Sequence, residues 1–389
     1  MPLHFQPSTA VRFLDDFRRR LVAHTWLTDV LAIFAIALLS RAALLIVGYA
    51  ALGHQADRVA LSTELCRFDC QWYLGIAEHG YTTTEANGQA GATSYGFFPL
   101  FPLLVRSVAP LFGGDFLWAA VAAANCCFLG GLIYVYRYAL LVGANRTAAL
   151  LAVAFLCVFP QSIAFSVPYS ESLFLLLFAA AIFHLLREQF LAAAIAAALL
   201  SATRPTGVLF MVFALACVLH STGPRIMFMA WRHPQRYLPL VFAPLGMFLF
   251  WSYCFLTVGD AFAHSHTELH GWGYHFMAPW RSLRMQLGAD GMSVPAAWCS
   301  FAIFACSLLL LVRRRYQEFA LCVAFFLLIW STTTVGSIFR YWLVLFPIWV
   351  EVARRLDGRP VSTAATFSVL GIVNGCMMWA WVLQDLAGI

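Results

Sequence analysis

Long apolar runs separated by short polar stretches make up most of this chain. Several runs reach the roughly 20 residues that a helix needs to cross a ~30 Å hydrocarbon layer, and no alternating pattern typical of a β-barrel is present. We therefore expect an all-α polytopic membrane protein with about eleven spanning helices. Their ranges are Trp26–Leu52, Phe116–Arg137, Thr147–Phe165, Tyr169–Leu186, Phe190–Thr203, Thr206–His220, Tyr237–Thr257, Val294–Val312, Phe319–Val335, Tyr341–Val352 and Ser362–Leu383.

Composition supports this interpretation. Of the 389 residues, 62% are hydrophobic and 11% are charged, and the mean hydropathy is +0.79. All 24 basic residues are arginine, so the chain has no lysine for Schiff-base chemistry or for a P-loop. The net charge of +6 needs no nucleic-acid partner, because the arginines form short clusters between apolar runs, as expected of membrane topology signals.

The distribution of arginine predicts the orientation. With a cytoplasmic N-terminus, the inner segments hold 16 arginines and the outer loops about five. We expect residues 1–25 to be a cytoplasmic N-terminal segment before an uncleaved anchor, and residues 26–389 to be a single transmembrane domain. Two large outer loops follow, at 54–115 and 258–293. In the first of them, the aromatic and proline-rich stretch "YGFFPLFPLLVRSVAPLF" predicts helices that lie in the membrane interface.

Three arginines lie near the outer ends of apolar segments: Arg41, Arg204 and Arg340. A charge inside the membrane costs a few kcal/mol, so each of them needs a partner or a function. For each arginine on its own, contact with headgroups or an ion pair with an acid such as Glu171 explains the charge as well as a functional role does. Three arginines in one leaflet favour a clamp for a lipid-linked phosphate or pyrophosphate, because guanidinium groups bind phosphate in bidentate fashion.

The stretch "RFDCQWYLGIAEHGY" at residues 67–81 carries the candidate chemistry of the first outer loop. A carboxylate beside an acceptor hydroxyl acts as a general base, which makes Asp69 the candidate catalytic residue. The alternative is a structural aspartate that caps a helix or pairs with Arg67. Should Asp69 not be the base, the remaining candidates are Glu78, Glu171 and Glu268.

Aromatic and histidine side chains surround this candidate base. Trp72, Tyr73 and Tyr81 are candidate platforms for a sugar or acceptor, with anchoring in the membrane interface as an equal alternative. His79 is a further candidate for substrate contact, although a histidine in such a position is more often structural.

Two clusters suggest other chemistry less strongly. Cys66 and Cys70 are four residues apart, which suits neighbours on a helix better than a disulfide. The second loop contains His264, His266, His270 and His275 together with Glu268, but the H-x-H-x3-H spacing fits no closed structural zinc site. The chain also has no DxD pair for a metal-bound nucleotide sugar, so we expect no metal and no cofactor.

Five motifs in a fixed order resemble a known family. They are "RFDCQWYLGIAEHGY", "FFPLFPLLVR", "PYSESLFLLL", "SATRPTGVLF" and "FRYWLVLFPIW", and they resemble the PIG-V family of glycosylphosphatidylinositol mannosyltransferases and its bacterial relatives. The likeness extends from Arg41 to about Pro347. It implies a GT-C fold and a glycosyltransferase that moves a sugar, with inversion, from a polyprenyl-phosphate carrier to an acceptor hydroxyl on the non-cytoplasmic side.

The resemblance also implies residue roles. The catalytic aspartate of GT-C enzymes corresponds to Asp69, and the other recurring motifs contain Glu171, Arg204 and the Arg340–Tyr341 pair. Gln71 follows shortly after Asp69 where eukaryotic members often have histidine and phenylalanine, which puts a glycosylphosphatidylinositol acceptor in doubt. Together with the arginine-only, alanine-rich composition, this indicates a bacterial inner-membrane enzyme with a periplasmic site.

Donor and acceptor follow from the same reasoning. We expect a polyprenyl-phosphate hexose as donor, mannose first among the candidates, and a membrane lipid or glycan as acceptor. The alternative class is a transporter or flippase for a lipid or a lipid-linked sugar, with a substrate site at the helix break beside Arg204 and Pro205. The chain has no clear internal repeat, and its charges gather at one surface, which favours the transferase.

Overall fold

The computed structural model describes residues 9–53, 65–84, 90–223, 231–288, 293–333 and 338–383. The regular secondary structure in these parts of the chain is helical, with a single isolated bridge between Phe276 and Thr332 and no β-strand. The expected all-α fold is therefore confirmed.

Among the described residues, five helical segments are long and apolar enough to cross a membrane: Trp26–Leu52, Phe116–Leu141, Pro205–Thr222, Val294–Val312 and Pro360–Leu383. They belong to α1 (Thr9–Leu52), α5 (Phe116–Leu141), η5 (Pro205–Leu209) with α9 (Phe210–Thr222), α15 (Ser293–Val312) and α19 (Pro360–Leu383). A sixth span arises if the bent pair Pro234–Phe242 and Leu245–Val258 crosses as one unit. It comprises η7 (Pro234–Tyr237), α11 (Leu238–Phe242) and α12 (Leu245–Val258), with a bend of 43°. The protein is thus a polytopic membrane protein.

Other apolar helices are shorter than the sequence predicts. They are α6 (Arg146–Val158), α7 (Glu171–Leu186), α8 (Phe190–Ser201) and α16 (Tyr316–Trp330). At 1.5 Å per residue such helices rise only ~18–24 Å, less than the hydrocarbon layer. The count of eleven spans therefore stays a prediction.

One predicted span is interrupted. Tyr341–Val352 was expected to be continuous, but the chain forms α17 (Ile338–Leu343), a short break, and then α18 (Phe346–Leu356). Pro347 lies in the first turn of α18, where its missing N–H costs no helical hydrogen bond. A proline deeper in a helix breaks the hydrogen-bond ladder, so the helix restarts just before Pro347.

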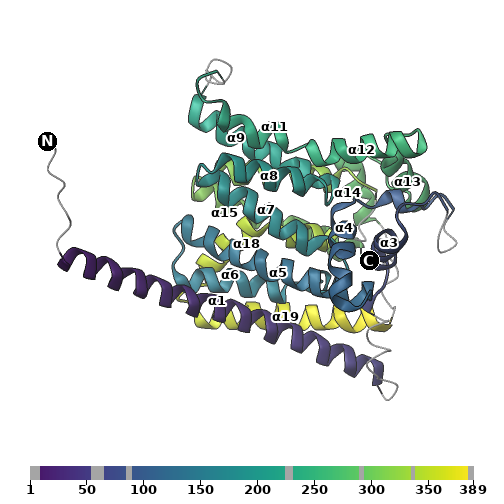
Figure 1. Ribbon diagram of the computed structural model, residues 1–389. Coiled ribbons are helices and arrows are strands. Elements are labelled where there is room, and N and C mark those ends of the chain that lie inside the picture. Colours follow the sequence, from purple (N-terminus) through teal and green to yellow (C-terminus); the bar gives the residue numbers. More distant parts are fainter. Residues whose placement is uncertain are drawn as a thin grey trace.

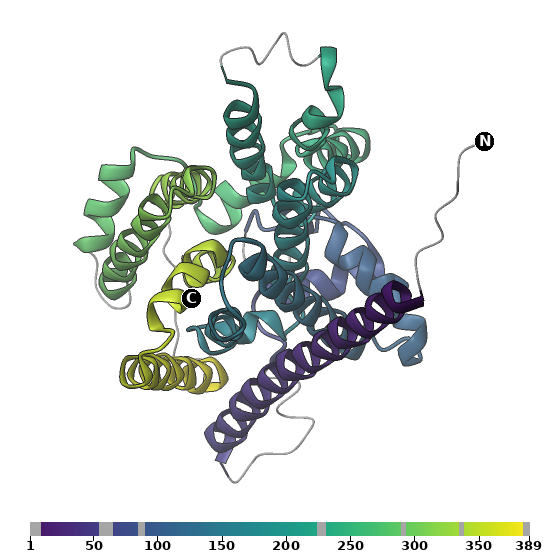
Figure 2. The same ribbon diagram turned by 90° about the vertical axis from the view of Figure 1, so that its left-hand side faces the viewer.

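The centre of the bundle is formed by α5, α6, α7 and α8 packed with α16 and α18. Small side chains let the helices approach closely. A Cβ added at Gly131 of α5 would lie 3.1 Å from Leu175 of α7, and close approach through small residues is how membrane helices associate. Figure 2 looks along the bundle, where most helices are seen nearly end-on while α1 crosses them obliquely.

The helices of the two predicted outer loops gather at one end of this bundle, which we call the loop end (Figure 1). They are α3 (Asp69–His79), η2 (Ser94–Gly96), α4 (Leu100–Val108), η3 (Ala109–Phe112), α13 (Ala263–Trp272) and α14 (Pro279–Leu287). α1 and α19 run side by side along one edge of the bundle, and the first turns of α1 project beyond the opposite end.

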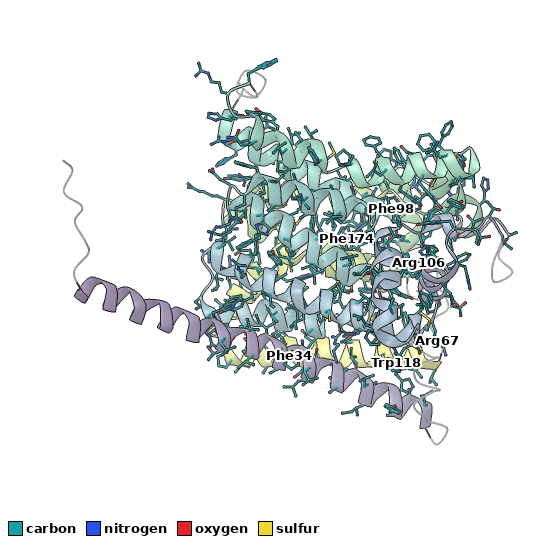
Figure 3. All side chains as sticks on the ribbon, in the orientation of Figure 1. Phe34, Arg67, Phe98, Arg106, Trp118 and Phe174 are labelled. Atoms are coloured by element: carbon teal, nitrogen blue, oxygen red, sulfur yellow. A yellow bond between two sulfur atoms is a disulfide. The ribbon has the colours of Figure 1, made fainter. Side chains whose placement is uncertain are left out.

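Apolar side chains cover the outside of the bundle as well as its interior. Phe34 and Trp118 are about half exposed, whereas Phe98 and Phe174 are buried (Figure 3). An outer surface this apolar is suited to lipid contact.

Candidate active site

Asp69 begins α3 at the loop end. The residue before it, Phe68, has φ 52°, a left-handed conformation that is unusual for a bulky side chain. This turn starts the helix with Asp69 in its first turn, and Trp72, Tyr73 and Ile76 bury the helix against the rest of the first loop. Asp69 therefore stands at a sharply turned helix start on a buried helix.

Glu171 is the first residue of α7 and is buried, with 1% of its surface exposed. A carboxylate at a helix N-terminus is favoured by the helix dipole. A buried carboxylate also needs charge partners, since desolvation of an unpaired charge is costly. Glu171 finds them in two arginines from other parts of the chain.

Arg204 is presented by the break between α8 and η5. Its backbone is extended, at φ −157° and ψ 148°, as the following Pro205 favours. The break is tightly packed, because a Cβ at Gly207 would lie 2.6 Å from the Leu200 carbonyl oxygen. The Arg204 guanidinium donates through Nη1 to Glu171 Oε1. The predicted helix break "SATRPTG" is confirmed, and it directs Arg204 to Glu171.

Arg340 of α17 joins the two carboxylates. Its Nη1 lies 2.5 Å from Asp69 Oδ2 and 3.1 Å from Glu171 Oε1. Four charges from α3, α7, the α8–η5 break and α17 thus form one chain in the order Asp69, Arg340, Glu171, Arg204. We call it the ion-pair chain. The alternative from sequence is an ion pair of Asp69 with its neighbour Arg67. In the structure Asp69 pairs with Arg340 instead.

Tyrosine rings surround the ion-pair chain. The Arg204 guanidinium carbon lies 5.3 Å from the centroid of the Tyr341 ring, and that of Arg340 lies 5.2 Å from the Tyr169 ring. These are cation–π distances. The Tyr73 hydroxyl lies 2.8 Å from Ser170 Oγ, directly before Glu171. Tyr341 and Tyr73 thus both lie next to the charged groups.

A small cavity of about 10 Å³, partly open to the surface, adjoins the ion-pair chain. Its polar lining consists of Glu171, Arg204, Arg340, Thr206 and the Tyr341 hydroxyphenyl group, and its apolar lining of Phe174 and Val344. Glu171 Oε2 is buried and has no hydrogen-bond partner among the described residues. Two guanidiniums and a carboxylate thus line this cavity together with apolar side chains.

Arg41 lies apart from the ion-pair chain. Its Nη1 donates to Ser162 O at 2.6 Å, and its Nη2 donates to Cys157 O at 2.7 Å and to Ser162 Oγ at 2.9 Å. Its guanidinium also lies 5.2 Å from the Phe128 ring. These contacts tie α1 to α6 and to η4 (Ser162–Phe165). Among the described residues, no hydrogen bond or ion pair joins Arg41 to the ion-pair chain.

Three other candidate residues, Trp72, Tyr81 and His79, lie outside the ion-pair chain. Trp72 is buried and stacks on Phe97, 5.6 Å between ring centroids. Tyr81 packs against aromatic rings of the first loop and α12, and its hydroxyl donates to Phe97 O. His79 is mostly exposed beside Glu78 at the far end of α3. None of these three contacts a residue of the ion-pair chain through an interaction found in the described structure.

The second loop closes over the first. Thr267 Oγ1 of α13 lies 2.8 Å from Thr93 Oγ1. A Cβ at Gly96 would lie 2.8 Å from the Trp272 ring, so glycine permits the close approach there. This contact brings α13 to the face of the loop end that holds Asp69.

Glu268 of α13 is thereby brought close enough to interact electrostatically with Asp69, Arg204 and Arg340. Burial raises the pKa of its carboxyl to about 8, the negative charge of Asp69 adds to this, and the two arginines oppose it. From the sequence, Glu268 is only a loop residue among histidines and a reserve candidate for the base. Its place as the one acid within the aromatic and histidine-rich stretch "AHSHTELHGWGYHF" is the signal that could have marked it.

The loop histidines serve separate structural contacts. His266 Nδ1 lies 2.7 Å from Asp260 Oδ2, and the His264 ring lies edge-on to Phe98 at 5.0 Å. Burial lowers the pKa of His264 to about 4, so this ring is neutral at physiological pH. Within the parts of the chain that the structure describes, no group of three or more His, Cys, Asp or Glu side chains is placed to hold a metal ion.

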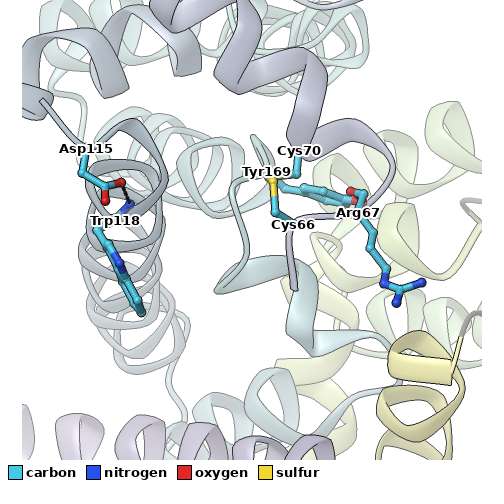
Figure 4. The surroundings of a disulfide bond; sticks show 6 residues. All are labelled: Cys66, Arg67, Cys70, Asp115, Trp118 and Tyr169. Atoms are coloured by element: carbon cyan, nitrogen blue, oxygen red, sulfur yellow. Dashed lines mark hydrogen bonds between the residues drawn. A yellow bond between two sulfur atoms is a disulfide. The ribbon is translucent and has the colours of Figure 1, made fainter. Parts of the chain in front are cut away.

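Cys66 and Cys70 form a disulfide, contrary to the expectation that they are merely neighbours on a helix (Figure 4). Their Cα atoms lie 5.2 Å apart. The expectation was wrong because Cys66 precedes α3 and the left-handed Phe68 folds the chain back between the two cysteines.

Comparison with known proteins defines the class of this protein. Residues 36–245, more than half of the chain, match the family model described as mannosyltransferase (PIG-V). The fold and this match make the protein a polytopic membrane protein of a mannosyltransferase family. It belongs to the PIG-V mannosyltransferase family, as its motifs suggest. The match includes Asp69, Glu171 and Arg204, while Arg340 lies beyond it.

Solved structures with some likeness are archaeal oligosaccharyltransferases. One is AglB from Archaeoglobus fulgidus in complex with an inhibitory peptide and a dolichol-phosphate, at 10% identity, TM-score 0.49, covering 92% of this chain and 56% of that chain. Another is the Archaeoglobus fulgidus oligosaccharyltransferase with Zn and sulfate, at 11% identity, TM-score 0.47, covering 92% and 53%. This chain spans about half the length of those proteins. No curated protein sequence matches it.

Proposed function

We propose that this protein transfers a hexose, with mannose as the first candidate, from a polyprenyl-phosphate carrier to a hydroxyl of a membrane lipid or glycan. The transfer inverts the anomeric carbon and occurs on the periplasmic face of a bacterial inner membrane, with the N-terminus in the cytoplasm. Membership of the mannosyltransferase family supports the transfer of a sugar. The donor class and the residue roles rest on the ion-pair chain.

The single observation that carries the proposal is the joining of Asp69 to Arg340, Glu171 and Arg204 beside an apolar-walled pocket. In the proposed mechanism Arg204 and Arg340 bind the donor phosphate, and the polyprenyl tail follows the apolar side of the site. A guanidinium has several N–H donors, so an ion pair with one carboxylate leaves it able to bind phosphate as well.

Asp69 is the proposed base. Its carboxylate removes the proton of the acceptor hydroxyl while the oxygen attacks the anomeric carbon from the face opposite the phosphate. The new glycosidic bond forms as the bond from the sugar to the phosphate oxygen breaks, and the phosphate leaves with the bonding electrons. Attack from the opposite face gives inversion.

The charges of the ion-pair chain suit this step. Two arginines and two carboxylates sum to zero. As Asp69 accepts the proton, the sum rises to +1 while the departing phosphate gains negative charge. Positive charge that is already in place stabilises such a developing anion without reorganisation of the site. Glu171 keeps the two arginines together before the donor arrives.

The experiment that tests the proposal uses the full-length protein in liposomes with a polyprenyl-phosphate mannose labelled in the sugar. Membrane lipids serve as the acceptor pool. The expected result is a new labelled product, the release of polyprenyl phosphate, and a glycosidic linkage opposite in configuration to that of the donor. Movement of the intact donor across the bilayer without transfer would instead support the transporter alternative and contradict the proposal.

A further inference from the structure

The disulfide between Cys66 and Cys70 closes a small ring of chain that contains Asp69. The cysteines are four positions apart, so Arg67, Phe68 and Asp69 are the three residues inside the ring. The candidate base is thus held between two covalently joined residues, one of which, Cys70, is fully buried. Figure 4 shows the bridge beside Tyr169, with the Arg67 side chain extending away from it.

The backbone inside the ring has an unusual conformation. Phe68 has φ 52°, and it occupies the N-cap position of α3, where its apolar side chain offers no hydrogen bond to the helix. A left-handed phenylalanine persists only where its surroundings impose that conformation. Phe68 is 43% exposed and touches Trp381 edge-on, so burial alone does not impose it. The closed ring supplies a constraint that does.

Hydrogen bonds anchor the ring on two sides. The carbonyl oxygen of Arg67 accepts from the Tyr169 hydroxyl at 2.9 Å and from the Cys70 backbone N–H at 3.1 Å. The Arg67 guanidinium donates to the Val382 carbonyl oxygen of α19 at 3.0 Å. Tyr169 is also the ring against which Arg340 stacks. Tyr169 therefore supports both the disulfide-closed ring that holds Asp69 and Arg340, the arginine that pairs with Asp69.

We propose that the Cys66–Cys70 disulfide positions Asp69 for catalysis and makes transfer depend on the oxidised state of these two cysteines. This inference rests on the proposed role of Asp69. Opening the ring would free Phe68 to return to ordinary backbone conformations. Asp69, one residue on, would then lose its fixed direction toward Arg340 and the acceptor. A displacement of about 1 Å in a reacting group lowers the rate by roughly 100-fold.

The dependence follows from thiol chemistry. A dithiol reduces the bridge by exchange: one thiolate attacks a sulfur of the disulfide, the second thiol resolves the mixed disulfide, and two cysteine thiols and a cyclic disulfide result. Disulfides persist on the oxidising side of a membrane and are rare in the cytosol. The enzyme would therefore reach full activity only after the loop end has entered an oxidising compartment.

The first test asks whether the bridge exists in the purified full-length protein. Alkylation of the denatured protein without reductant should leave the peptide containing residues 66–70 unmodified, and reduction beforehand should add two alkyl groups. Two alkyl groups without prior reduction would overturn the proposal.

The second test compares turnover of the wild type with that of the Cys66→Ser/Cys70→Ser variant, using polyprenyl-phosphate mannose as donor. We expect kcat to fall roughly 10- to 100-fold with the donor KM within about twofold, since positioning of the base affects the chemical step and not phosphate binding. Cys126→Ser/Cys376→Ser removes two exposed free thiols as the matched control and should retain full kcat. Full kcat in the first variant would contradict the proposal.

Reversible reduction of the wild type covers the case in which the serine variant does not fold. Reduction should lower kcat, and reoxidation should restore it, while Asp69→Asn stays inactive in both states. Hydrogen–deuterium exchange over residues 65–79 gives a readout that needs no activity: exchange should rise on reduction. If the wild type transfers no sugar, the proposed function fails. Unchanged exchange on reduction would overturn the positioning role, whether or not transfer occurs.

Discussion

The guanidinium of Arg340 lies 2.5 Å from the carboxylate of Asp69, across 271 positions of the sequence. The same Nη1 lies 3.1 Å from Glu171, so one nitrogen connects a partly exposed carboxylate at the loop end to a buried one. This connection places the candidate base next to the candidate phosphate clamp. The predictions below test the two halves separately.

Asp69→Asn should reduce sugar transfer by about 10²- to 10⁴-fold, the usual contribution of a general base. The amide keeps the shape of the carboxyl but does not accept a proton at neutral pH. Turnover with saturating donor and the thermal midpoint measure activity and fold. Glu78→Gln, a partly exposed acid on the same helix, is the matched control and should retain activity. Near-normal turnover of Asp69→Asn would move the base to another carboxylate.

Arg204→Lys should raise the donor KM by roughly 10- to 100-fold, because one charge-assisted contact contributes about 1.5–3 kcal/mol. Lysine keeps a positive charge beside the buried Glu171 but loses the bidentate geometry. Steady-state kinetics with varied donor measure the effect. Arg281→Ala on α14 removes an exposed arginine of the loop end as the control. An unchanged donor KM with full turnover would exclude Arg204 from the phosphate site.

Arg41→Ala should lower stability without changing donor use. The substitution removes the guanidinium donor of the Ser162 carbonyl oxygen and one of the two side-chain donors of the Cys157 carbonyl oxygen, at a cost of about 2–4 kcal/mol. The thermal midpoint should fall, while the donor KM of the folded fraction should remain that of the wild type. A raised donor KM with unchanged stability would return Arg41 to the phosphate site.

Stability should depend on pH through Glu268. Its pKa is raised to about 8 by burial and by the charge of Asp69, so the folded state binds its proton more tightly than the unfolded chain does. The stability from this group is fully present below the ordinary glutamate pKa of about 4.5 and is lost as pH rises through 8. The thermal midpoint of the wild type should therefore fall more between pH 5 and 9 than that of Glu268→Gln. Parallel curves for the two proteins would contradict this.

Much of the candidate site can be predicted from the sequence. The break at Arg204 follows from Pro205 and Gly207, and Asp69, Glu171 and Arg340 stand in ordered family motifs. An ion pair of these arginines with Glu171 is one of the alternatives that the sequence offers, and Arg204 and Arg340 form it. The pairing of Arg340 with Asp69 was not predictable, because it depends on packing between helices far apart in the chain. Arg41 looked equivalent to the other two arginines, since the acceptors that bind it are backbone carbonyls of a distant segment.

The Cys66–Cys70 disulfide and the break in the span Tyr341–Val352 were not predicted, for a different reason. A spacing of four between Cys66 and Cys70 indicates a helix unless the chain turns between them, and a left-handed phenylalanine is too rare to expect. The span at Tyr341–Val352 appeared continuous because its hydropathy is unbroken, although Pro347 starts a new helix. Backbone geometry decided both cases, and side-chain polarity gave no sign of it.

The most direct test of the central claim is a structure of the full-length protein with a bound polyprenyl-phosphate sugar. The account predicts the donor phosphate within about 3 Å of the guanidiniums of Arg204 and Arg340, and the Asp69 carboxylate on the opposite face of the anomeric carbon. A phosphate bound elsewhere at the loop end, with Arg340 still held by Asp69 and Glu171, would contradict it.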